Sequence, residues 1–407
     1  MSQENDRQLP DGWQWVKLGD VCETTSGGTP SRNVASYYDG DIHWVKSGDL
    51  NDGYIQDTEE LISELAIKNS SAKIFSSGTL LIAMYGATVG KLGILNIDAA
   101  TNQAVCAIFP NDNLIRNYLF LYLLNKRQDL IEISFGGAQP NISQNIIRGI
   151  EIPLPPLSEQ KRIAAILNEQ MEAVEKARKA TEAQLEAAKA LPAAYLRAVF
   201  ESEEANSWER RKLGEICQSN GQYGTSEKST NVNQGLPVLR MGNIIEGKIN
   251  WSDLMYVNLP TDEETKFLLK KGDVLFNRTN SAELVGKTAV FDAEFKAVFA
   301  SYLIRFKMRY NLADPYYISA YINSRQGRKF IEANMTRAIG QVNISASTMY
   351  NMPIPIPPTL EKQKQIASTL TEQMQEVERL KQNLKEQLDT INKLPAVLLR
   401  RAFKGEL

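Results

Sequence analysis

The sequence predicts an α+β protein in which two β-rich globules alternate with two long helices that form an antiparallel coiled coil. Three observations support this prediction: an internal repeat, a heptad pattern that occurs twice, and short apolar segments separated by Gly, Asn and Asp. A chain of 407 residues exceeds one ordinary hydrophobic core. Two domains of roughly 150 residues each, with helices between them, are the natural division.

The repeat is strongest in the helical segments, where one offset is kept throughout. Ile163 corresponds to Ile366 and Phe200 to Phe403, and both pairs are 203 positions apart. Upstream the matches are sparse and the offset drifts, as for Trp13 with Trp208. The predicted boundaries are listed here: a first globule at residues 1–152, a first helical region at 153–203, a second globule at 204–354 and a second helical region at 355–407.

Both helical regions show apolar residues at alternating spacings of four and three, which is typical of a coiled-coil seam. Proline-rich segments precede them and exclude helix there, and Ser158 or Thr359 can cap the helix that follows. One apolar stripe needs a partner, so we expect the two copies to pair antiparallel with pseudo-twofold symmetry. The predicted seam residues are Ile163, Leu167, Val174, Leu191, Ile366, Leu370, Val377, Leu380, Leu384, Ile391 and Leu394.

The globules contain apolar runs that predict strands, such as Thr79–Ala83 and Asp273–Phe276. A helical segment follows in each copy, at residues 118–128 and 316–330. Each globule is therefore assigned to the α+β class.

Several kinds of chemistry are excluded by residue type. His43 is the only histidine, so neither a histidine-based metal site nor a Ser-His-Asp arrangement is expected, and we interpret it as a polar loop or strand residue. A phosphate-binding loop at Gly286 would need glycine where Ser281 stands. Cys22 and Cys217 match in the repeat, so these two and Cys106 are predicted to be buried core residues. We predict no catalytic residue, no metal and no cofactor bound by this chain.

The chain also lacks an apolar run of the ~20 residues that a membrane helix needs, so we expect a cytoplasmic protein without membrane contact. Lys and Arg (46) nearly balance Asp and Glu (48). Local clusters nevertheless occur, as at Arg305, Lys307 and Arg309. They suit either phosphate neutralisation or an ordinary solvated surface.

Polar and basic residues on the glycine-punctuated loops are suited to reading DNA. Arg pairs with guanine, and Asn or Gln with adenine, through two hydrogen bonds, although each of these residues also suits turn capping. The candidate base-reading residues are Lys46, Ser47, Tyr85, Asn102, Gln103, Arg240, Asn243, Arg278, Asn280 and Ser281. Lys91, Lys287 and Arg305 are the candidates for phosphate contact.

At residues 152–164 and their second copy, at Gly272–Lys287 and at residues 140–143, the sequence resembles the specificity (S) subunits of type I restriction-modification systems. The resemblance covers essentially the whole chain. It implies a non-catalytic subunit whose two target recognition domains each bind one half of a split, asymmetric site in double-stranded DNA. A departure from the repeat is that Met84 stands where the second copy has Arg278.

The resemblance also implies partners. The helices would set the gap between the half-sites and dock two methyltransferase (M) subunits, which bring S-adenosylmethionine and methylate adenine. Restriction and translocase (R) subunits would supply ATP- and Mg-dependent cleavage. A coiled-coil-spaced scaffold that binds proteins without DNA specificity is the alternative, because divergent globules beside constant helices would serve it equally well.

Overall fold

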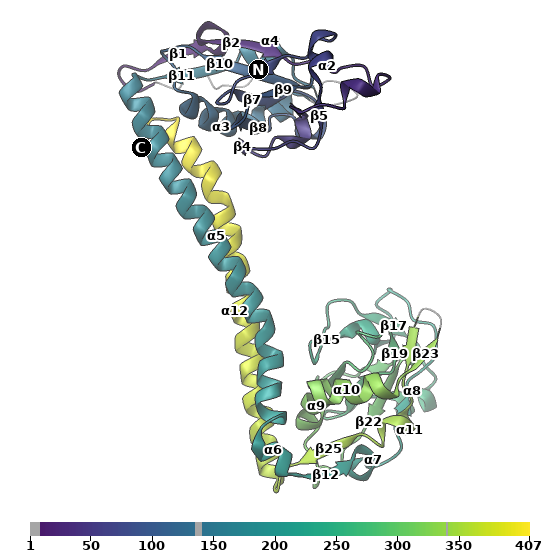
Figure 1. Cartoon of the computed structure of the whole chain (residues 1–407). Helices are drawn as coiled ribbons and strands as arrows, with labels where there is room; N and C mark the ends of the chain where they lie inside the picture. Colours follow the sequence, from purple (N-terminus) through teal and green to yellow (C-terminus); the bar gives the residue numbers. More distant parts are fainter. Residues whose placement is uncertain (1–8, 135–140, 339–340) are drawn as a thin grey trace. The chain divides into compact units, whose positions relative to one another are not determined.

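The structure, a computed structural model, describes residues 9–134, 141–338 and 341–407, so Pro140 of the third resembling segment lies outside the described residues. The chain divides into two compact units, Met1–Thr181 with Glu386–Leu407, and Glu182–Lys385. Each unit contains one globule and part of both long helices, α5 (Leu157–Phe200) and α12 (Leu360–Ala402) (Figure 1). The predicted α+β architecture is confirmed.

Mixed sheets form the first globule. A five-stranded sheet has the order β2-β10-β7-β8-β4, a four-stranded sheet has the order β5-β3-β9-β6, and β1 pairs with β11. The central strand β7 is buried along its whole length, as its continuous apolar run requires. The strands are β1 (Gln14–Lys17), β2 (Cys22–Ser26), β3 (Ile42–Val45), β4 (Gly53–Ile55), β5 (Leu61–Ile62), β6 (Ile74–Phe75), β7 (Leu80–Ala83), β8 (Leu92–Leu95), β9 (Ala99–Thr101), β10 (Val105–Pro110) and β11 (Glu151–Leu154).

One long helix of the first globule packs on these strands. Tyr118, Leu119 and Leu123 share a core with Leu80 and Ile108. The predicted helix at 118–128 is confirmed within this element, which is longer. The helices are α1 (Leu18–Val21), α2 (Glu64–Lys68), α3 (Arg116–Ser134) and α4 (Gln144–Arg148), with 3-10 turns η1 (Ala35–Tyr37), η2 (Ser47–Asp49) and η3 (Gly86–Thr88).

The second globule repeats this plan in smaller sheets. Their orders are β13-β22-β18-β20, β17-β14-β21 and β19-β24-β23, and β12 pairs with β25 as β15 does with β16. The strands are β12 (Glu209–Lys212), β13 (Gln222–Tyr223), β14 (Leu236–Leu239), β15 (Ile244–Ile245), β16 (Lys248–Ile249), β17 (Met255–Val257), β18 (Val274–Asn277), β19 (Thr279–Asn280), β20 (Thr288–Val290), β21 (Val298–Phe299), β22 (Leu303–Phe306), β23 (Thr336–Ala338), β24 (Gln341–Asn343) and β25 (Pro353–Ile356).

The helical segment predicted at 316–330 is two helices, which corrects the expectation of one. Ser324 is buried, and its side-chain oxygen accepts a hydrogen bond from the Gly327 amide (3.3 Å) at the start of the second helix. This N-cap separates the two elements. The helices are α6 (Glu203–Ser207), α7 (Leu213–Ile216), α8 (Thr261–Phe267), α9 (Pro315–Asn323), α10 (Arg325–Asn334) and α11 (Ala346–Met349), with the 3-10 turn η4 (Met241–Asn243).

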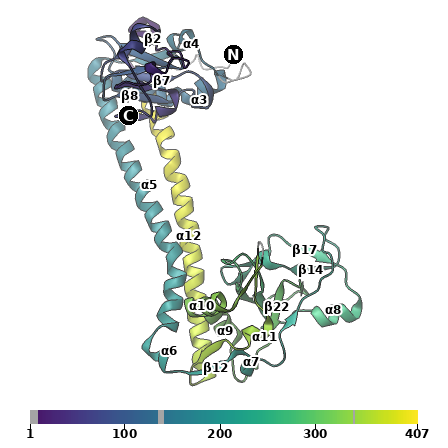
Figure 2. The ribbon, with the colours of Figure 1, turned by 45° about the vertical axis from the view of Figure 1, so that its right-hand side comes forward.

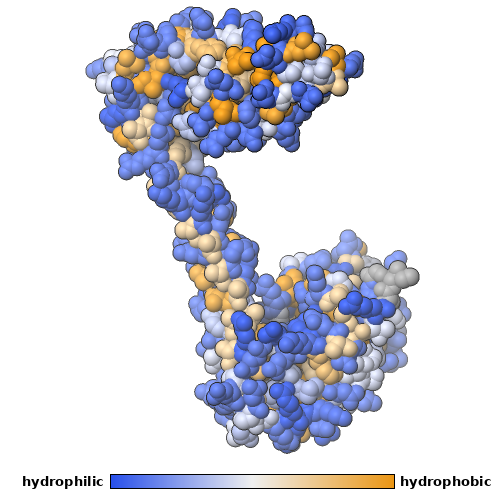
Figure 3. Space-filling model, viewed as in Figure 1, coloured by the Kyte–Doolittle hydropathy of each residue, from blue (hydrophilic) through white to orange (hydrophobic). Residues whose placement is uncertain are grey.

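Within each unit the long helices pack antiparallel, as predicted. In the first unit Ile163, early in α5, shares a core with Leu399 late in α12. In the second unit Phe200, at the end of α5, shares a core with Leu370 early in α12. Figure 2 shows the two helices side by side in both units, and their outward surface on the face drawn in Figure 3 is mostly hydrophilic.

The seam itself needs a correction. Most predicted seam residues are buried or half-buried, but Leu380 and Leu394 are 42% and 37% exposed. At Leu380 the buried stripe uses the next position instead, because Lys381 is 8% exposed. Pro395, which follows Leu394, is half-buried. The Nζ of Lys381 binds Glu246 (3.0 Å) and Glu378 (2.9 Å). A lysine can bury its stem while its charge is paired, so the apolar pattern alone favoured Leu380 wrongly.

The helix starts differ between the copies. Thr359 Oγ1 accepts a hydrogen bond from the Lys362 amide (3.2 Å), so its predicted capping role is confirmed. Helix α5 already begins at Leu157, which places Ser158 inside the first turn. The first turn of α5 is closed by a backbone hydrogen bond from the Glu159 amide to the Pro156 carbonyl (2.9 Å), not by a Ser158 cap.

A buried glutamine joins each helix to its globule. The Gln160 side chain accepts from the Ile115 amide (2.8 Å) and donates to the carbonyls of Asn113 and Pro155 (both 2.9 Å). Gln363, its repeat partner, accepts from the Asp314 amide and donates to the Leu312 carbonyl (both 3.0 Å). Equivalent contacts therefore fix both globule–helix junctions.

The cysteines are core residues, as expected. Cys22, Cys106 and Cys217 are buried and unpaired, and burial raises the pKa of each thiol to about 12. His43, interpreted from the sequence as a polar loop or strand residue, lies in strand β3. Among the described residues, no helix combines the length and the apolar character that a membrane crossing requires.

Candidate nucleic-acid interface

In each globule a short 3-10 turn begins directly after a basic residue at the end of a strand. Lys46 follows β3 and precedes η2, and Arg240 follows β14 and precedes η4. The Asp49 carboxylate accepts from the Lys46 amide (2.7 Å), and the Asn243 side chain accepts from the Arg240 amide (2.8 Å). The two basic residues therefore occupy equivalent and equally fixed positions.

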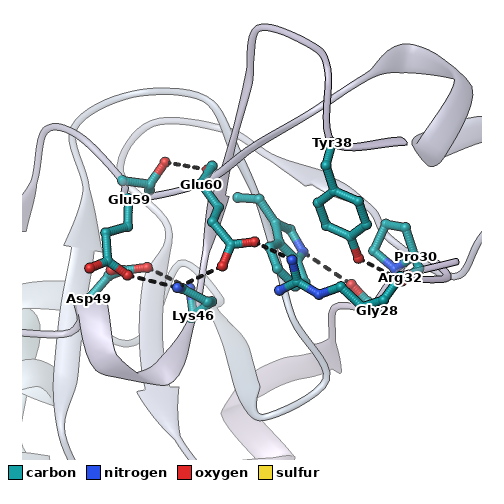
Figure 4. Close-up of polar contacts among 10 residues, drawn as sticks. Gly28, Pro30, Arg32, Tyr38, Lys46, Asp49, Glu59 and Glu60 are labelled. Carbon is teal, nitrogen blue, oxygen red and sulfur yellow. Dashed lines mark hydrogen bonds and ion pairs between the residues drawn. The ribbon is translucent and has the colours of Figure 1, made fainter. Parts of the chain in front are cut away.

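Both basic side chains are half-buried and paired with carboxylates. Lys46 Nζ lies 2.8 Å from Glu59 and 2.9 Å from Glu60, and the hydrogen bond that Lys46 donates to Glu59 is the main cause that raises the pKa of Lys46 (Figure 4). Arg240 lies 3.0 Å from Asp253. Glu59 and Asp253 each follow their basic partner by 13 residues. An acid–base pair with the same sequence separation is therefore present in each globule.

Arg32 extends the charged group in the first globule, and sequence reasoning missed it. Its guanidinium lies 4.3 Å from the ring centroid of Tyr38 and 2.7 Å from Glu60 (Figure 4). Glu60 therefore bridges Arg32 and Lys46, and these contacts lower its pKa, the hydrogen bond from Arg32 most. The available signal was an arginine in a loop beside the aromatic residues Tyr37 and Tyr38.

A second pair of equivalent loops follows the central strands β7 and β18. An arginine from the neighbouring helix holds each loop by its carbonyls. Arg127 Nε donates to Gly90 (3.0 Å), and Arg328 donates to Val285 and, at 3.2 Å, to Glu283. These anchors give both loops a fixed shape. Sequence reasoning assigned this role to neither arginine.

The candidate residues on these two loops are partly accessible. Tyr85 is 39% exposed, and its backbone forms a bridge with Asn141. Lys91 and Lys287 are half-buried. Ser281 is exposed, and the Asn280 side chain accepts from the Ser281 amide (2.8 Å), which is a turn-capping contact.

Three further candidates lie after strands β3 and β9. Ser47 is half-buried in η2. Asn102 is half-buried and accepts from the Ala104 amide (3.1 Å), again a turn contact. Gln103 is exposed and accepts a hydrogen bond from the Thr29 hydroxyl.

Burial revises two of the expectations. Arg305 is 4% exposed, binds Asp273 (3.3 Å) and the Leu268 carbonyl (2.6 Å), and its pKa is lowered by desolvation. Asn243 is 2% exposed, and its side-chain amide nitrogen donates to the carbonyls of Asn250 (3.1 Å) and Asp253 (3.0 Å). Both side chains support the fold, so neither belongs to the candidate surface.

Arg278 has a different environment. It directly follows β18 and is half-buried, donates to the Asn343 side chain (3.1 Å) and lies 4.7 Å from the ring centroid of Tyr223. Sequence reasoning selected Arg278 but missed Tyr223, which is 40% exposed. Nothing in the local sequence of Tyr223 links it to Arg278.

The described residues contain no group of three or more His, Cys, Asp or Glu side chains arranged to hold a metal ion. The surface offers basic side chains at equivalent places in the two globules, together with amide and aromatic side chains on the neighbouring loops. These are the side chains that contact phosphates and base edges. The fold and the surface together define a protein class with two nucleic-acid-recognition domains on paired helices.

The family model described as the type I restriction modification DNA specificity domain matches residues 10–186 and 206–390. The chain therefore belongs to this family and carries the domain twice. This match favours the DNA reader over the protein-binding scaffold.

Individual relatives agree with the family match. The chain is 27% identical to the type I restriction enzyme MjaIX specificity subunit of Methanocaldococcus jannaschii over 311 residues, 72% of each protein. It is 24% identical to the EcoKI specificity subunit of Escherichia coli, covering 98% of this chain and 90% of the relative.

Solved structures show the same fold. An HsdS subunit from Thermoanaerobacter tengcongensis gives a TM-score of 0.69 at 23% identity, covering 99% of this chain and 100% of the other. A second chain, from a study of complex assembly and conformational transition in the type I R-M system, gives a TM-score of 0.72 at 23% identity, covering 98% and 100%.

Proposed function

We propose that this protein is the DNA-recognition subunit of a type I restriction-modification complex and that each globule reads one half of a split, asymmetric site. The observation that carries the proposal is the occurrence of two DNA specificity domains with different side chains at equivalent places. Lys46 corresponds to Arg240, and Met84 to Arg278. Two domains with different contact residues suit two different half-sites.

The chain itself is proposed to be non-catalytic and to bind no cofactor. Two M subunits would supply S-adenosylmethionine and transfer the methyl group to adenine, and R subunits would supply ATP- and Mg-dependent restriction. The exposed leucines Leu380 and Leu394 support partner contact along α12, because they lie outside the seam that the helices bury. We place the complex in the cytoplasm with double-stranded DNA as its ligand.

The proposal is tested by fluorescence anisotropy of the protein, bound to its M partner, on random duplex DNA across a salt series. Neutralisation of phosphates by Lys and Arg releases counterions, so the affinity should fall steeply as salt rises. Mapping of methyladenine in a host that expresses both proteins should then give one bipartite motif. Absent or salt-insensitive binding would overturn the DNA-reading function.

A further inference from the structure

The guanidinium of Arg278 is held in a fixed position by neutral groups alone. Its Nη2 donates to the Asn343 side-chain oxygen (3.1 Å), and the amide of Asn343 donates in turn to the Thr279 hydroxyl (3.1 Å). The Tyr223 ring lies 4.7 Å from the guanidinium carbon. The Tyr223 hydroxyl accepts from the Ala346 amide (3.2 Å), so the ring that supports Arg278 is itself anchored.

The backbone of Arg278 is fixed as well. Its amide donates to the Tyr302 carbonyl and its carbonyl accepts from the Ile344 amide, both at 3.0 Å. The end of β18 is therefore held from two sides before any ligand arrives. A side chain on such a backbone loses little conformational freedom on binding, which favours specific recognition.

Arg278 differs from the other arginines of the candidate surface in that no carboxylate pairs with it. Arg240 and Arg305 are neutralised by Asp253 and Asp273, and Arg32 is neutralised by Glu60. No carboxylate of the described residues forms an ion pair with Arg278. Its buried Nε has no hydrogen-bond partner there, but the same holds for Arg240 and Arg305, so the missing carboxylate is what sets Arg278 apart. A half-buried positive charge without a carboxylate partner is costly, which points to a ligand that accepts hydrogen bonds from it.

The first globule lacks this arrangement. The Ile142 amide donates to the Met84 carbonyl (2.9 Å) as the Ile344 amide does to Arg278, so these positions are equivalent. Met84 is apolar and 2% exposed. Strand register places Ser26, opposite Cys106, where the second globule has Tyr223 opposite Ile304. Among the described residues, this place after the central strand therefore carries an arginine with an aromatic support only in the second globule.

The geometry points to Arg278 as a guanine-reading residue for the half-site of the second globule, with Tyr223 and Asn343 as its positioning residues. This inference rests on the proposed function. A planar guanidinium donates two parallel hydrogen bonds to the O6 and N7 atoms of guanine, and no other base offers two acceptors on that edge. The side-chain oxygen of Asn343 occupies one Nη2 hydrogen, and because Nε is buried, the other Nη hydrogens are the ones left for the base.

The test begins with the methyladenine motif of the wild-type complex with its M partner. Arg278→Gln and Arg278→Lys are then mapped in the same host. Gln removes the charge, whereas Lys keeps the charge and loses the planar fork. Both variants should relax one guanine position in one half of the motif and leave the other half and the spacer unchanged.

A binding assay separates the base from the phosphate. Replacing that guanine by 7-deazaguanine removes N7 and should weaken wild-type binding about 10-fold or more while leaving Arg278→Gln unaffected. Equal weakening of every sequence, random duplex included, with a salt slope lower by about one, would identify a phosphate contact and overturn guanine reading. An unchanged motif in both variants would overturn it too.

Two further variants separate a loss of base reading from a loss of folding. Met84→Leu changes the equivalent position of the first globule and should leave the second half of the motif intact. Tyr223→Ala should reproduce the relaxed guanine position, a change in base preference that a purely structural role would not cause. Failure of the proposed function differs from all of these outcomes, because the wild-type complex would then give no motif.

Discussion

The ring of Phe403 lies edge-on to the ring of Tyr118, with 5.3 Å between the two centroids. Phe403 directly follows α12, whereas Tyr118 belongs to α3, so the second helical copy completes the core of the first globule. Phe200, at the end of the first helical copy, has the same relation to Tyr317 of the second globule, at 5.5 Å. Each helix therefore ends as a core element of the globule that it does not follow in sequence.

Replacing Phe403 by Ala should destabilise the first globule by about 3–5 kcal/mol, because it removes a ring that is 7% exposed and leaves a cavity. Hydrogen exchange followed by mass spectrometry should show lost protection in α3 and retained protection in α9. Phe200→Ala is the matched control and should show the reverse. Equal loss in both globules for either variant would contradict the assignment.

Replacing Gln160 by Met should destabilise the first junction by about 1–3 kcal/mol or more, since it leaves the Ile115 amide and the Asn113 and Pro155 carbonyls without their partner. Urea unfolding monitored by circular dichroism measures the change. Gln184→Met is the control, because Gln184 is an exposed residue of the same helix. Similar effects of the two substitutions would show that the buried amide contributes nothing.

The parts of the fold that follow from local patterns could be predicted from the sequence. The repeat and the heptads predicted both long helices, and the apolar runs predicted strands β7 and β18. The seam was placed one residue off at Leu380, because a lysine whose charge is paired by Glu246 behaves as a buried residue. Glu246 lies in the turn between β15 and β16. The sequence of the helix alone does not show that this turn lies beside Lys381.

The candidate surface could be predicted only in outline. Arg305 looked like a surface cation, yet its partners Asp273 and Leu268 lie 32 and 37 positions away in the sequence. Asn343, which positions Arg278, lies 65 positions from it. Whether a polar residue is satisfied inside the fold depends on such distant groups, and residue type alone does not reveal it.

Alkaline pH should destabilise the protein through its buried thiols. Burial raises the pKa of Cys106 from 9.0 to about 12, so the folded state keeps a proton that the unfolded chain releases. The stabilising contribution is complete below pH 9 and is lost as the pH rises toward 12. Comparing urea midpoints at pH 8 and pH 10.5, wild type should lose more stability than Cys106→Ala.

Tyr118 and Tyr317, whose pKa values burial also raises, are present in both proteins and contribute equally. The difference between wild type and Cys106→Ala therefore isolates the thiol. Parallel losses in the two proteins would mean that the Cys106 thiol does not titrate differently on unfolding.

The acid–base pairs at equivalent places predict how the protein limits non-specific binding. Glu59 and Asp253 are 78% and 84% exposed at their side chains and pair with Lys46 and Arg240. A phosphate must compete with these carboxylates for the two cations. The double variant Glu59→Gln, Asp253→Asn should therefore bind random duplex several-fold more tightly at low salt and with a steeper salt slope, measured by anisotropy of the complex with its M partner.

The matched control for that variant changes the same number of charges on the helices. Glu172 and Glu376 are each 68% exposed and pair with Lys176 and Arg379. The double variant Glu172→Gln, Glu376→Gln has the same net charge as the test variant but leaves Lys46 and Arg240 paired. If both double variants raise the affinity equally, net charge alone explains the gain and the local competition is refuted. A gain confined to the test variant means that the two carboxylates restrain the cations beside the DNA, because their removal leaves Arg240 without a carboxylate and Lys46 with Glu60 alone.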